Sequence, residues 1–462
     1  MSHSRAPTFS AVSLFSNCGA GDVGYRKAGF RFDVMAELDP RRLEIALLNH
    51  PGAIGVPGDL RSTWRKVVKQ YRDRAGKRRP ALLCACPPCQ GMSTARANRG
   101  NEADPDAGTK DARNLLVVVI AKVAKALKPK IIVVENVPQF LTRLVRDPRD
   151  DTAITAAHYL LRELRREYVA YPIVADLADY GVPQHRKRAF MTFVRKDLAG
   201  LRLLQTDRRA PFPRPTHATD YGDAGATTLS EALRDFDLPP LDAATDEGAQ
   251  SEIGDGMHVV PVWDERTYEM VATIPANSGR SAWENDTCLQ CGTTGITRKV
   301  ALCPTCKAIL PRPVIQAKNG RYRLIKGFHS SYRRMKPAEP AFTITTATGH
   351  VGSDTTIHPT ENRVLSPLEC ALLQTFPPTF DWGDALDKWG ITSVRDMIGE
   401  AVPPLFTMQH GRILVDVIRA RQWTFPAILD VDKRCEHAAE ILGRPASTKA
   451  LTSDEKRNAA RR

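Results

Sequence analysis

A cysteine that follows two prolines is the residue of this sequence best suited to covalent chemistry. Pro87-Pro88-Cys89-Gln90 comes directly after a strand-like run at 81–85 and precedes a segment rich in Gly, Ser, Arg and Asn. Prolines restrict the backbone and so fix the direction of the thiol, while a loop of that composition can close over a substrate. The neighbouring Cys84 and Cys86 are better interpreted as small buried apolar side chains. We therefore predict that Cys89 is a nucleophile.

A carboxyl group and two guanidinium groups belong to other strand-like segments. Glu135 ends the apolar run at 131–134, and Arg186 and Arg188 open the run that ends at Val194. Side chains alternate along a strand, so the two arginines are predicted to share one side, where they can hold an anion or orient a carboxylate. The alternative for Glu135 is a cap on the segment that follows it. The prediction is an acid and two arginines at one edge of a sheet.

A glycine-rich turn predicts a cofactor site. The run at 11–15 leads into Ser16–Gly24, the next run ends at Glu37, and a further turn contains Asp59. Glycines allow a close approach to a ligand, and carboxylates accept hydrogen bonds from ribose hydroxyls or an adenine amino group. The glycine spacing is not the G-x-G-x-x-G of nicotinamide binders. Although a tight turn alone is the simpler alternative, the three segments together favour an adenosyl ligand without phosphates.

Four cysteines form two Cys-x-x-Cys pairs, a spacing typical of a structural zinc site. The pairs are Cys288/Cys291 and Cys303/Cys306, and a short Thr- and Gly-rich stretch separates them. Four thiolates close a tetrahedral site and leave no open position for catalysis. Iron or unligated thiols are the alternatives.

Alternating strand-like and amphipathic segments must position these groups. From about residue 9 to 195, β-type runs alternate with helix candidates at 114–127 and 153–167. This alternation predicts an α/β fold, a mostly parallel sheet covered on both faces. A helix at 405–421 is expected to pack back on this sheet.

The domain boundaries follow from changes in composition. A catalytic domain is predicted at 9–200, before a Pro- and Arg-rich stretch, and a smaller, irregular target recognition domain with the cysteine ribbon (about 285–310) at 201–362. A return segment with the C-terminal helix is expected at 363–422. The extension at 423–462 is expected to be frayed at its basic end.

Composition is that of a globular protein with basic character. The 462 residues are 42% hydrophobic and 26% charged, with 66 Lys and Arg against 52 Asp and Glu, a net charge of +14. Such a surplus is compatible with nucleic acid but does not require it. The sequence has no apolar run long enough to span a bilayer and no signal-peptide core at its N-terminus, so we expect a cytoplasmic location without membrane contact.

In order along almost the whole chain, these motifs resemble the cytosine-5 methyltransferase family. Phe15 to Gly24, Pro87 to Gln90, Asp111 to Leu115 and Glu135-Asn136-Val137 resemble family motifs, and so do Gln184-x-Arg186-x-Arg188, Arg363 to Pro377 and Gly399 to Pro404. The resemblance implies a Rossmann-like sheet, S-adenosylmethionine as methyl donor, and DNA as substrate. Family members usually have Asn where this chain has Glu400, which puts that local contact in doubt.

The resemblance also implies roles for individual residues. Cys89 would attack C6 of a flipped cytosine, Glu135 would hydrogen-bond the ring, and Arg188, with Arg186, would help to position it. The predicted cofactor residues are Phe15, Gly19, Gly21, Glu37, Asp59, Pro87 and Glu400. The predicted DNA contacts are Gln90, Ser93, Arg113, Arg333 and Arg334.

Other classes of protein remain to be weighed at this point. A transfer RNA methyltransferase on the same scaffold is the nearest, but the long cysteine-bearing insert favours double-stranded DNA. An inactive zinc-ribbon protein is disfavoured because Cys89, Glu135 and Arg188 are all present, and a nicotinamide oxidoreductase because its glycine fingerprint is absent. We expect a monomer that serves a restriction system with a companion endonuclease or acts as an orphan modification enzyme.

Overall fold

The computed structural model describes residues 9–88, 115–223, 225–254, 256–327 and 330–443. The chain divides into two compact units. Unit 1 comprises Met1–Tyr180, Lys187–Thr216 and Val402–Arg462, and unit 2 comprises Gly181–Arg186 and His217–Ala401. Within the described ranges, no helix is both long enough and apolar enough to cross a bilayer.

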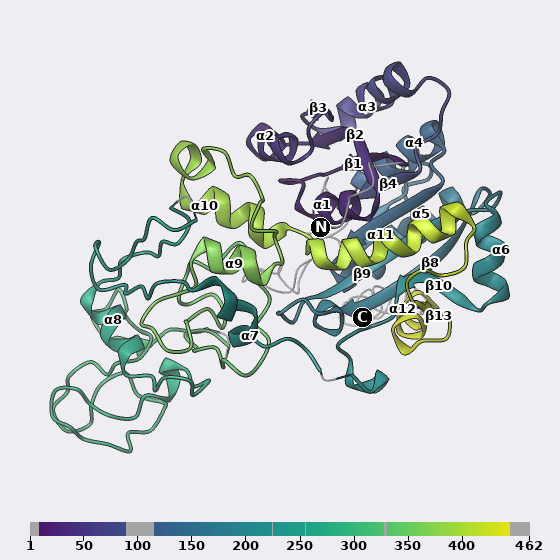
Figure 1. The fold of residues 1–462 in the computed structure, drawn as a ribbon. Helices are drawn as coiled ribbons and strands as arrows, with labels where there is room; N and C mark the ends of the chain where they lie inside the picture. Colours follow the sequence, from purple (N-terminus) through teal and green to yellow (C-terminus); the bar gives the residue numbers. More distant parts are fainter. Residues whose placement is uncertain (1–8, 89–114, 224, 255, 328–329, 444–462) are drawn as a thin grey trace. The chain divides into compact units, whose positions relative to one another are not determined.

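Unit 1 is built on one seven-stranded sheet (Figure 1). Its strands are, in spatial order, β3 (Ile54–Pro57), β2 (Phe30–Glu37), β1 (Phe9–Leu14), β4 (Leu82–Ala85), β5 (Ile131–Asn136), β9 (Lys187–Arg195) and β8 (Tyr168–Asp176). Neighbours from β3 to β5 are parallel, whereas β9 is antiparallel to both β5 and β8. The predicted α/β fold with a mostly parallel sheet is confirmed.

Helices on both faces explain why the central strands are apolar throughout. Every residue of β4 and β5 is buried, as expected for parallel strands between two helical layers. One group of helices packs side by side: α3 (Leu60–Ala75), α4 (Leu116–Leu127) and α5 (Ala156–Leu164). A second group consists of α1 (Ala20–Ala28), α6 (Ala199–Thr206) and α11 (Pro404–Arg419). The C-terminal helix thus lies within unit 1, two residues shorter at its end than predicted.

Smaller elements complete unit 1. They are α2 (Pro40–Asn49), α12 (Lys433–Gly443), β6 (Leu144–Arg146), β7 (Ala153–Thr155), β10 (Arg209–Pro213), β13 (Ala427–Leu429), and 3-10 turns at Pro138–Leu141 and Leu177–Tyr180. The predicted helix 153–167 is wrong at its start, because residues 153–155 form β7 and Thr155 caps α5 by accepting a hydrogen bond from the backbone N–H of His158. Most of the extension predicted from 423 onward is structured, since β13 pairs with β10 and α12 packs on β8. Its end, from 444, lies outside the described residues.

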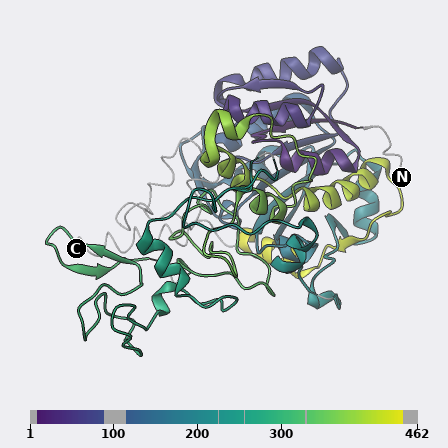
Figure 2. The ribbon, with the colours of Figure 1, turned by 60° about the vertical axis from the view of Figure 1, so that its left-hand side comes forward.

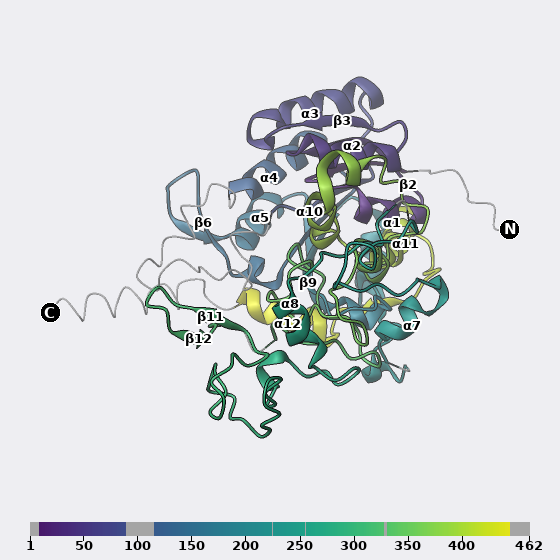
Figure 3. The ribbon, with the colours of Figure 1, turned by 90° about the vertical axis from the view of Figure 1, so that its left-hand side faces the viewer.

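Unit 2 consists mainly of loops with short elements (Figure 2). These elements are α7 (Leu229–Leu233), α8 (Glu265–Ala272), α9 (Pro367–Leu373), α10 (Ala385–Glu400), β11 (Val314–Gln316), β12 (Tyr322–Leu324), and 3-10 turns at Thr219–Tyr221, Arg234–Phe236 and Ala282–Glu284. Strands β11 and β12 form a two-stranded antiparallel ribbon, visible at the lower left of Figure 3. With so few ladder hydrogen bonds, the loop carbonyls of unit 2 need other donors.

Buried arginines supply many of those donors. The four largest fully buried side chains among the described residues are Arg186, Arg312, Arg334 and Arg363, and all four belong to unit 2. Arg334 donates to the carbonyls of Ile274, Val271, His358 and Glu361. Arg312 donates in the same way to four carbonyls of the cysteine ribbon, those of Asn285, Ile296, Thr297 and Val300. In unit 2 buried guanidinium groups therefore add to the backbone hydrogen bonds between loops, where unit 1 uses a sheet.

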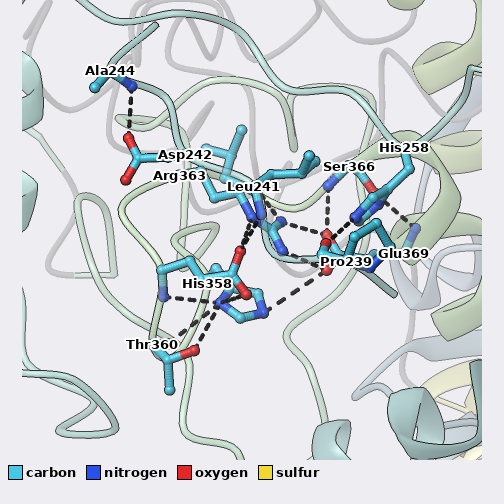
Figure 4. Close-up of polar contacts among 12 residues, drawn as sticks. Pro239, Leu241, Asp242, Ala244, His258, His358, Thr360, Arg363, Ser366 and Glu369 are labelled. Atoms are coloured by element: carbon cyan, nitrogen blue, oxygen red, sulfur yellow. Dashed lines mark hydrogen bonds and ion pairs between the residues drawn. The ribbon is translucent and has the colours of Figure 1, made fainter. Parts of the chain in front are cut away.

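Arg363 makes the best-defined ion pair of unit 2 (Figure 4). Its guanidinium contacts both carboxylate oxygens of Glu369, at 2.6 and 2.8 Å, and both side chains are 2% exposed. Burial raises the pKa of Glu369, but the charge of Arg363 outweighs that effect and lowers it to about 2. Ser366 begins α9 with a capping box to Glu369 and bonds the ring of His258 at 3.0 Å. This network fixes the start of α9.

Candidate active site

The direction of β9 brings the first two catalytic candidates together. In the antiparallel pair, Asn136 at the end of β5 lies opposite Ala189 near the start of β9. The beginning of β9 therefore lies at the carboxyl edge of the parallel strands, where open α/β sheets bind ligands. Arg188 Nε contacts Glu135 Oε1 at 3.0 Å, and the two side chains are 13% and 10% exposed. Little water reaches this pair, so the arginine fixes the direction of the carboxylate.

The residue after Glu135 holds the start of the cysteine loop. Asn136 Nδ2 donates to the carbonyl oxygen of Pro87 at 2.9 Å, while Asn136 Oδ1 accepts from the backbone N–H of Val137 at 2.8 Å. The buried amide thereby joins the end of β5 to the backbone that leads into Pro88. The predicted residues Cys89, Gln90, Ser93 and Arg113 lie outside the described residues.

The two other cysteines of this segment have no features of a nucleophile. Cys84 is 4% exposed, and burial together with the charge of Asp22 raises the pKa of its thiol well above the usual value. Burial, followed by the charges of Glu135 and Asp22, does the same for Cys86. A nucleophilic cysteine needs a lowered pKa. The prediction of a buried apolar side chain is confirmed for Cys84, whereas Cys86 is only partly buried.

The turn between β1 and α1 has an unusual backbone. Phe15, Asn17 and Gly19 have φ angles of 58°, 49° and 77°, a left-handed conformation that is rare for an aromatic residue. Glu37, at the end of β2, stabilises this turn: one carboxylate oxygen accepts from the Asn17 N–H at 2.8 Å and the other from the Leu38 N–H at 2.8 Å. Burial raises the pKa of Glu37, although these hydrogen bonds oppose it. Strain of this kind concentrates at ligand sites.

Two predicted glycines of this turn have different roles. Gly19 supplies the left-handed residue before α1. At Gly21 a Cβ atom would approach the Val402 side chain to 3.1 Å, and at Gly24 it would come within 2.0 Å of Thr407 Oγ1. Gly21 and Gly24 are therefore needed for the packing of α1 against Val402 and α11. Only Gly19 has the geometry expected of a residue that shapes a ligand turn.

The same edge offers groups that fit an adenosyl ligand. Leu38, directly after Glu37, is 66% exposed, so an apolar surface lies beside a carboxylate at the end of β2. Asp59 caps α3 through the Arg61 N–H and pairs with the Arg61 side chain at 2.5 Å, yet a third of its side chain remains exposed. An apolar surface for a base, a carboxylate for hydroxyls and a tight turn without a phosphate-binding fingerprint together match the chemistry of S-adenosylmethionine.

A buried acid lies behind the turn. Asp22, in the first turn of α1, is 6% exposed and accepts a hydrogen bond from Ser13 Oγ at 2.8 Å. Burial raises the pKa of Asp22 to about 7, and the bond from Ser13 only partly opposes this. Burial therefore favours the neutral form of this carboxyl group.

Arg186 is a correction to the predicted catalytic set. It precedes β9 and is 1% exposed, with Nη1 donating to the carbonyl of Ile344 at 2.8 Å. Its Nη2 donates to the carbonyls of Gly399 and Ala401, at 2.9 and 2.8 Å, on either side of Glu400. The assumption that strand alternation reaches back to residue 186 was wrong. Arg186 is a positioning residue of unit 2 that fixes the backbone around Glu400, the last residue of α10.

Arg334 was predicted to contact DNA, and this prediction was wrong. Its guanidinium is buried and bonded to four carbonyls and to Asn362 Oδ1, and burial lowers its pKa to about 10. A side chain with its donors used inside the protein has none to offer DNA. Arg333 is only partly buried and bonds the carbonyl of Gly279.

The four predicted metal ligands do come together. The sulfur atoms of Cys288, Cys291, Cys303 and Cys306 all lie within 4.8 Å of one another. Two of the Sγ–Sγ distances are 3.6 Å, close to the ~3.8 Å that tetrahedral Zn–S bonds of about 2.3 Å require. Each pair is followed by a residue of positive φ, Gly292 at 69° and Lys307 at 64°. The two turns are thus alike, as in a closed four-thiolate site.

Comparisons with known proteins identify the family of the chain. The family model for C-5 cytosine-specific DNA methylase matches residues 9–414. The chain belongs to this family and is an enzyme of the cytosine-5 DNA methyltransferase class, which confirms the resemblance seen in the sequence motifs.

Individual relatives are similar over nearly their full length. The type II methyltransferase M1.HgaI of Avibacterium volantium is 29% identical over 404 residues, 85% of this chain and 94% of that protein. The type II methyltransferase M.AgeI of Thalassovita gelatinovora is 25% identical over 467 residues, 88% of this chain and 98% of that protein. A crystal structure described as a putative DNA modification methyltransferase encoded within an E. coli prophage has a TM-score of 0.52 at 19% identity, covering 89% of this chain and 100% of that chain. At that identity the structure shows a shared fold.

The sequence analysis missed three residues of this site. Asn136 was part of a quoted motif, but no local pattern reveals that its amide bonds a carbonyl 49 positions earlier. Leu38 carried a detectable signal, because it is a large apolar residue between two acids at a strand end. Asp22 gave a weaker one, an acid within an otherwise apolar and glycine-rich helix start.

Proposed function

We propose that the chain methylates C5 of a flipped cytosine in double-stranded DNA through a covalent bond between Cys89 and C6. The observation that carries this proposal is the Glu135–Arg188 pair at the carboxyl edge of the sheet, beside the backbone that leads into Cys89. A carboxyl group held in place at that edge is what an enzyme needs to grip the polar side of a cytosine ring.

The residues have distinct tasks in the reaction. Addition of the Cys89 thiolate to C6 makes C5 nucleophilic, and Glu135 hydrogen-bonds N3 and the exocyclic amine, where charge develops. Arg188 holds Glu135 in place. After methylation, loss of the C5 proton and departure of the thiolate restore the aromatic ring. Flipping the base costs on the order of a few kcal/mol, which contacts between the protein and the duplex must offset.

We propose that the edge formed by Phe15, Gly19, Glu37, Asp59 and Pro87 holds S-adenosylmethionine, with Leu38 against the adenine. The bound cofactor supplies an electrophilic methyl group. Glu37 orients the ribose hydroxyls and Asp59 faces the adenine amino group, while the contact at Glu400 differs from the usual family residue. Titration of S-adenosylhomocysteine tests this binding: Glu37→Ala should weaken it at least tenfold, whereas the exposed control Glu44→Ala should leave it unchanged.

Replacement of the nucleophile is the direct test of the reaction. Cys89→Ser should reduce transfer of a tritiated methyl group to DNA below detection, while duplex binding is retained. Cys435→Ser, a cysteine of α12, serves as the matched control and should keep its activity. Turnover by the Cys89→Ser enzyme would refute the covalent mechanism, and transfer to transfer RNA but not to DNA would refute the substrate.

The relatives are type II methyltransferases, which supports a role beside a restriction endonuclease. We propose that this chain acts as a monomer on the same sequence as such an endonuclease, without a physical complex. Bisulfite sequencing of DNA from cells that express the protein would report the reaction and its sequence context together. Methylated cytosines scattered without a shared context would contradict the proposal.

We propose that the four clustered thiolates bind structural zinc. Freshly purified protein should contain one zinc per chain by mass spectrometry, and Cys303→Ser should lose it. Cys370→Ser, a buried cysteine of α9, should retain it. Absence of zinc from the unmodified protein, or the presence of iron instead, would contradict the assignment.

A further inference from the structure

Two adjoining stretches of unit 2 carry opposite charge. Residues 217–285 contain fourteen acidic and three basic residues, whereas residues 286–326 contain one acidic residue and eight basic ones. The second stretch holds the cysteine ribbon and the β11–β12 hairpin. DNA phosphates are attracted to the second stretch and repelled by the first. By charge, the second stretch is therefore the better candidate for contact with a polyanion.

The hairpin has the form of a ribbon that enters a groove. Val314 pairs with Leu324, and Ile315 with Arg323. The turn is closed by a hydrogen bond of 2.8 Å from the Gly320 N–H to the Ala317 carbonyl, with Gly320 at φ 76°. A two-stranded ribbon fits the major groove of B-DNA, which is roughly 12 Å wide.

One face of this ribbon is free to meet a partner. Directly opposed residues share a face, so at the root of the hairpin Val314 and Leu324 lie on one face, and Ile315 and Arg323 lie on the other. Val314 is 7% exposed, whereas Ile315 is 44% exposed and Arg323 is also exposed. An exposed cation beside an exposed apolar side chain is suited to contact with the edge of a DNA base.

The basic side chains of the hairpin are not neutralised within unit 2. In the described part of the chain, no ion pair joins an acidic group to Lys318, Arg321, Arg323 or Lys326, and all four are exposed. Arg323 Nη1 donates to the carbonyl of its neighbour Leu324 at 3.2 Å. Arg298 of the cysteine ribbon, in contrast, pairs with Glu284 at 3.2 Å. The hairpin therefore carries four exposed basic side chains without an acidic partner among the described residues.

Its root is held firmly enough to direct these groups. Arg266 Nη2 donates to the Val314 carbonyl at 2.8 Å. Two positions before Val314, the buried Arg312 bonds carbonyls on both sides of the first cysteine pair. The cysteine ribbon and the hairpin are thus joined by one buried guanidinium group. A rigid base is what a reading element requires, because base contacts need a fixed geometry.

We propose that the β11–β12 hairpin enters the major groove of the substrate duplex and that Arg323 reads a guanine of the recognition sequence. This inference rests on the proposed function for its substrate. Arg323 is the specificity-determining residue because a guanidinium group bonds guanine O6 and N7 together. Lys318, at the turn, contacts a backbone phosphate and contributes affinity without sequence information.

Methylation of a duplex library with randomised sequence around each cytosine, read by bisulfite sequencing, tests the reading role. The unmodified enzyme defines the preferred sequence. Arg323→Ala should relax the requirement for guanine at one position of it and reduce kcat/KM on the preferred site about 5- to 150-fold, since a bidentate contact is worth about 1–3 kcal/mol. Arg202→Ala, an exposed arginine of α6, is the matched control and should change neither.

Binding measurements separate the phosphate contact from the base contact. In fluorescence anisotropy, Lys318→Ala should lower the affinity for all duplexes equally. It should also lower the salt dependence of binding by about one phosphate contact and leave the preferred sequence unchanged. An Arg323→Ala enzyme with an unaltered preferred sequence would overturn the proposal, and so would an equal loss on all sequences. If hairpin variants weaken binding of transfer RNA but not of duplex DNA, the partner is wrong.

The two proposals fail in different ways. If the unmodified protein transfers no methyl group, the proposed function fails, while a loss of duplex binding in the triple variant Lys318→Ala, Arg321→Ala, Lys326→Ala still supports the hairpin as the DNA contact. If that triple variant binds duplex DNA as tightly and with the same salt dependence as the unmodified protein, and methylation proceeds normally, the hairpin assignment fails and the proposed function stands. All substituted residues are exposed, so thermal stability should remain unchanged.

Discussion

Units 1 and 2 satisfy their buried backbone groups by different means. In unit 1 the strands and helices bond their own backbone, and the functional groups stand at one edge of the sheet. In unit 2 the loops are bonded by Arg312, Arg334 and Arg363, together with Arg186. The difference teaches that an arginine of unit 2 can be a structural donor, and that burial distinguishes such arginines from those free to meet a ligand.

The largest expected effect concerns Glu135, at the edge of the sheet in unit 1. Glu135→Gln should lower kcat for methyl transfer about 10²- to 10⁴-fold, because the amide cannot supply the proton and charge that the carboxyl group supplies at the ring. Steady-state assays with tritiated cofactor measure this, and Glu44→Gln, exposed on α2, is the control. Unchanged kcat would remove Glu135 from the catalytic set.

A smaller effect is expected from removing a buried arginine of unit 2. Arg334→Met leaves several buried carbonyls without donors, and each costs about 1–3 kcal/mol, so unit 2 should lose roughly 4 kcal/mol of stability. Hydrogen exchange should accelerate throughout unit 2, while the amides of β5 in unit 1 remain protected. Arg298→Met, an exposed arginine of unit 2, should have little effect. If unit 2 stayed protected in the Arg334→Met protein, the structural role of the buried arginines would be refuted.

The smallest effect concerns the buried acid of unit 1. The pKa of Asp22 is about 7 in the folded protein and near 3.8 when unfolded, so the folded state binds more protons between these values. Its contribution to stability is present below about pH 4 and is lost as pH rises through 7. Asp22→Asn, neutral at every pH, should be more stable than the unmodified protein by on the order of 2 kcal/mol at pH 8, with a smaller gain at pH 5. Urea denaturation at both pH values measures this gain. The exposed control Asp73→Asn should show no such pH dependence, and an equal gain at both pH values would argue against a buried, titrating Asp22.

Local pattern predicted most of unit 1 and little of unit 2. The runs that became β1, β2, β4, β5 and β9 were recognised because strands buried on both faces are continuously apolar. The two edge strands were missed, β3 because two of its four residues are Gly55 and Pro57, and β8 because it contains Pro172, which an edge strand tolerates. Unit 2 has few regular elements and little periodicity, so only its cysteine spacing and the family motifs that begin at Arg363 and Gly399 were recognised.

The sequence by itself determined the family, the cysteine pairs and the identity of Glu135 and Arg188. Only the tertiary structure decided that β9 runs against β5, which brings Arg188 to Glu135. The tertiary structure also decided that Arg186, two positions earlier, donates hydrogen bonds to the carbonyls on either side of Glu400. In the same way it buried Arg334 and left Arg323 exposed. The physical reason is that an arginine looks the same in sequence whether its five donors meet carbonyls of distant loops or remain free for a ligand. Long-range folding alone assigns those partners.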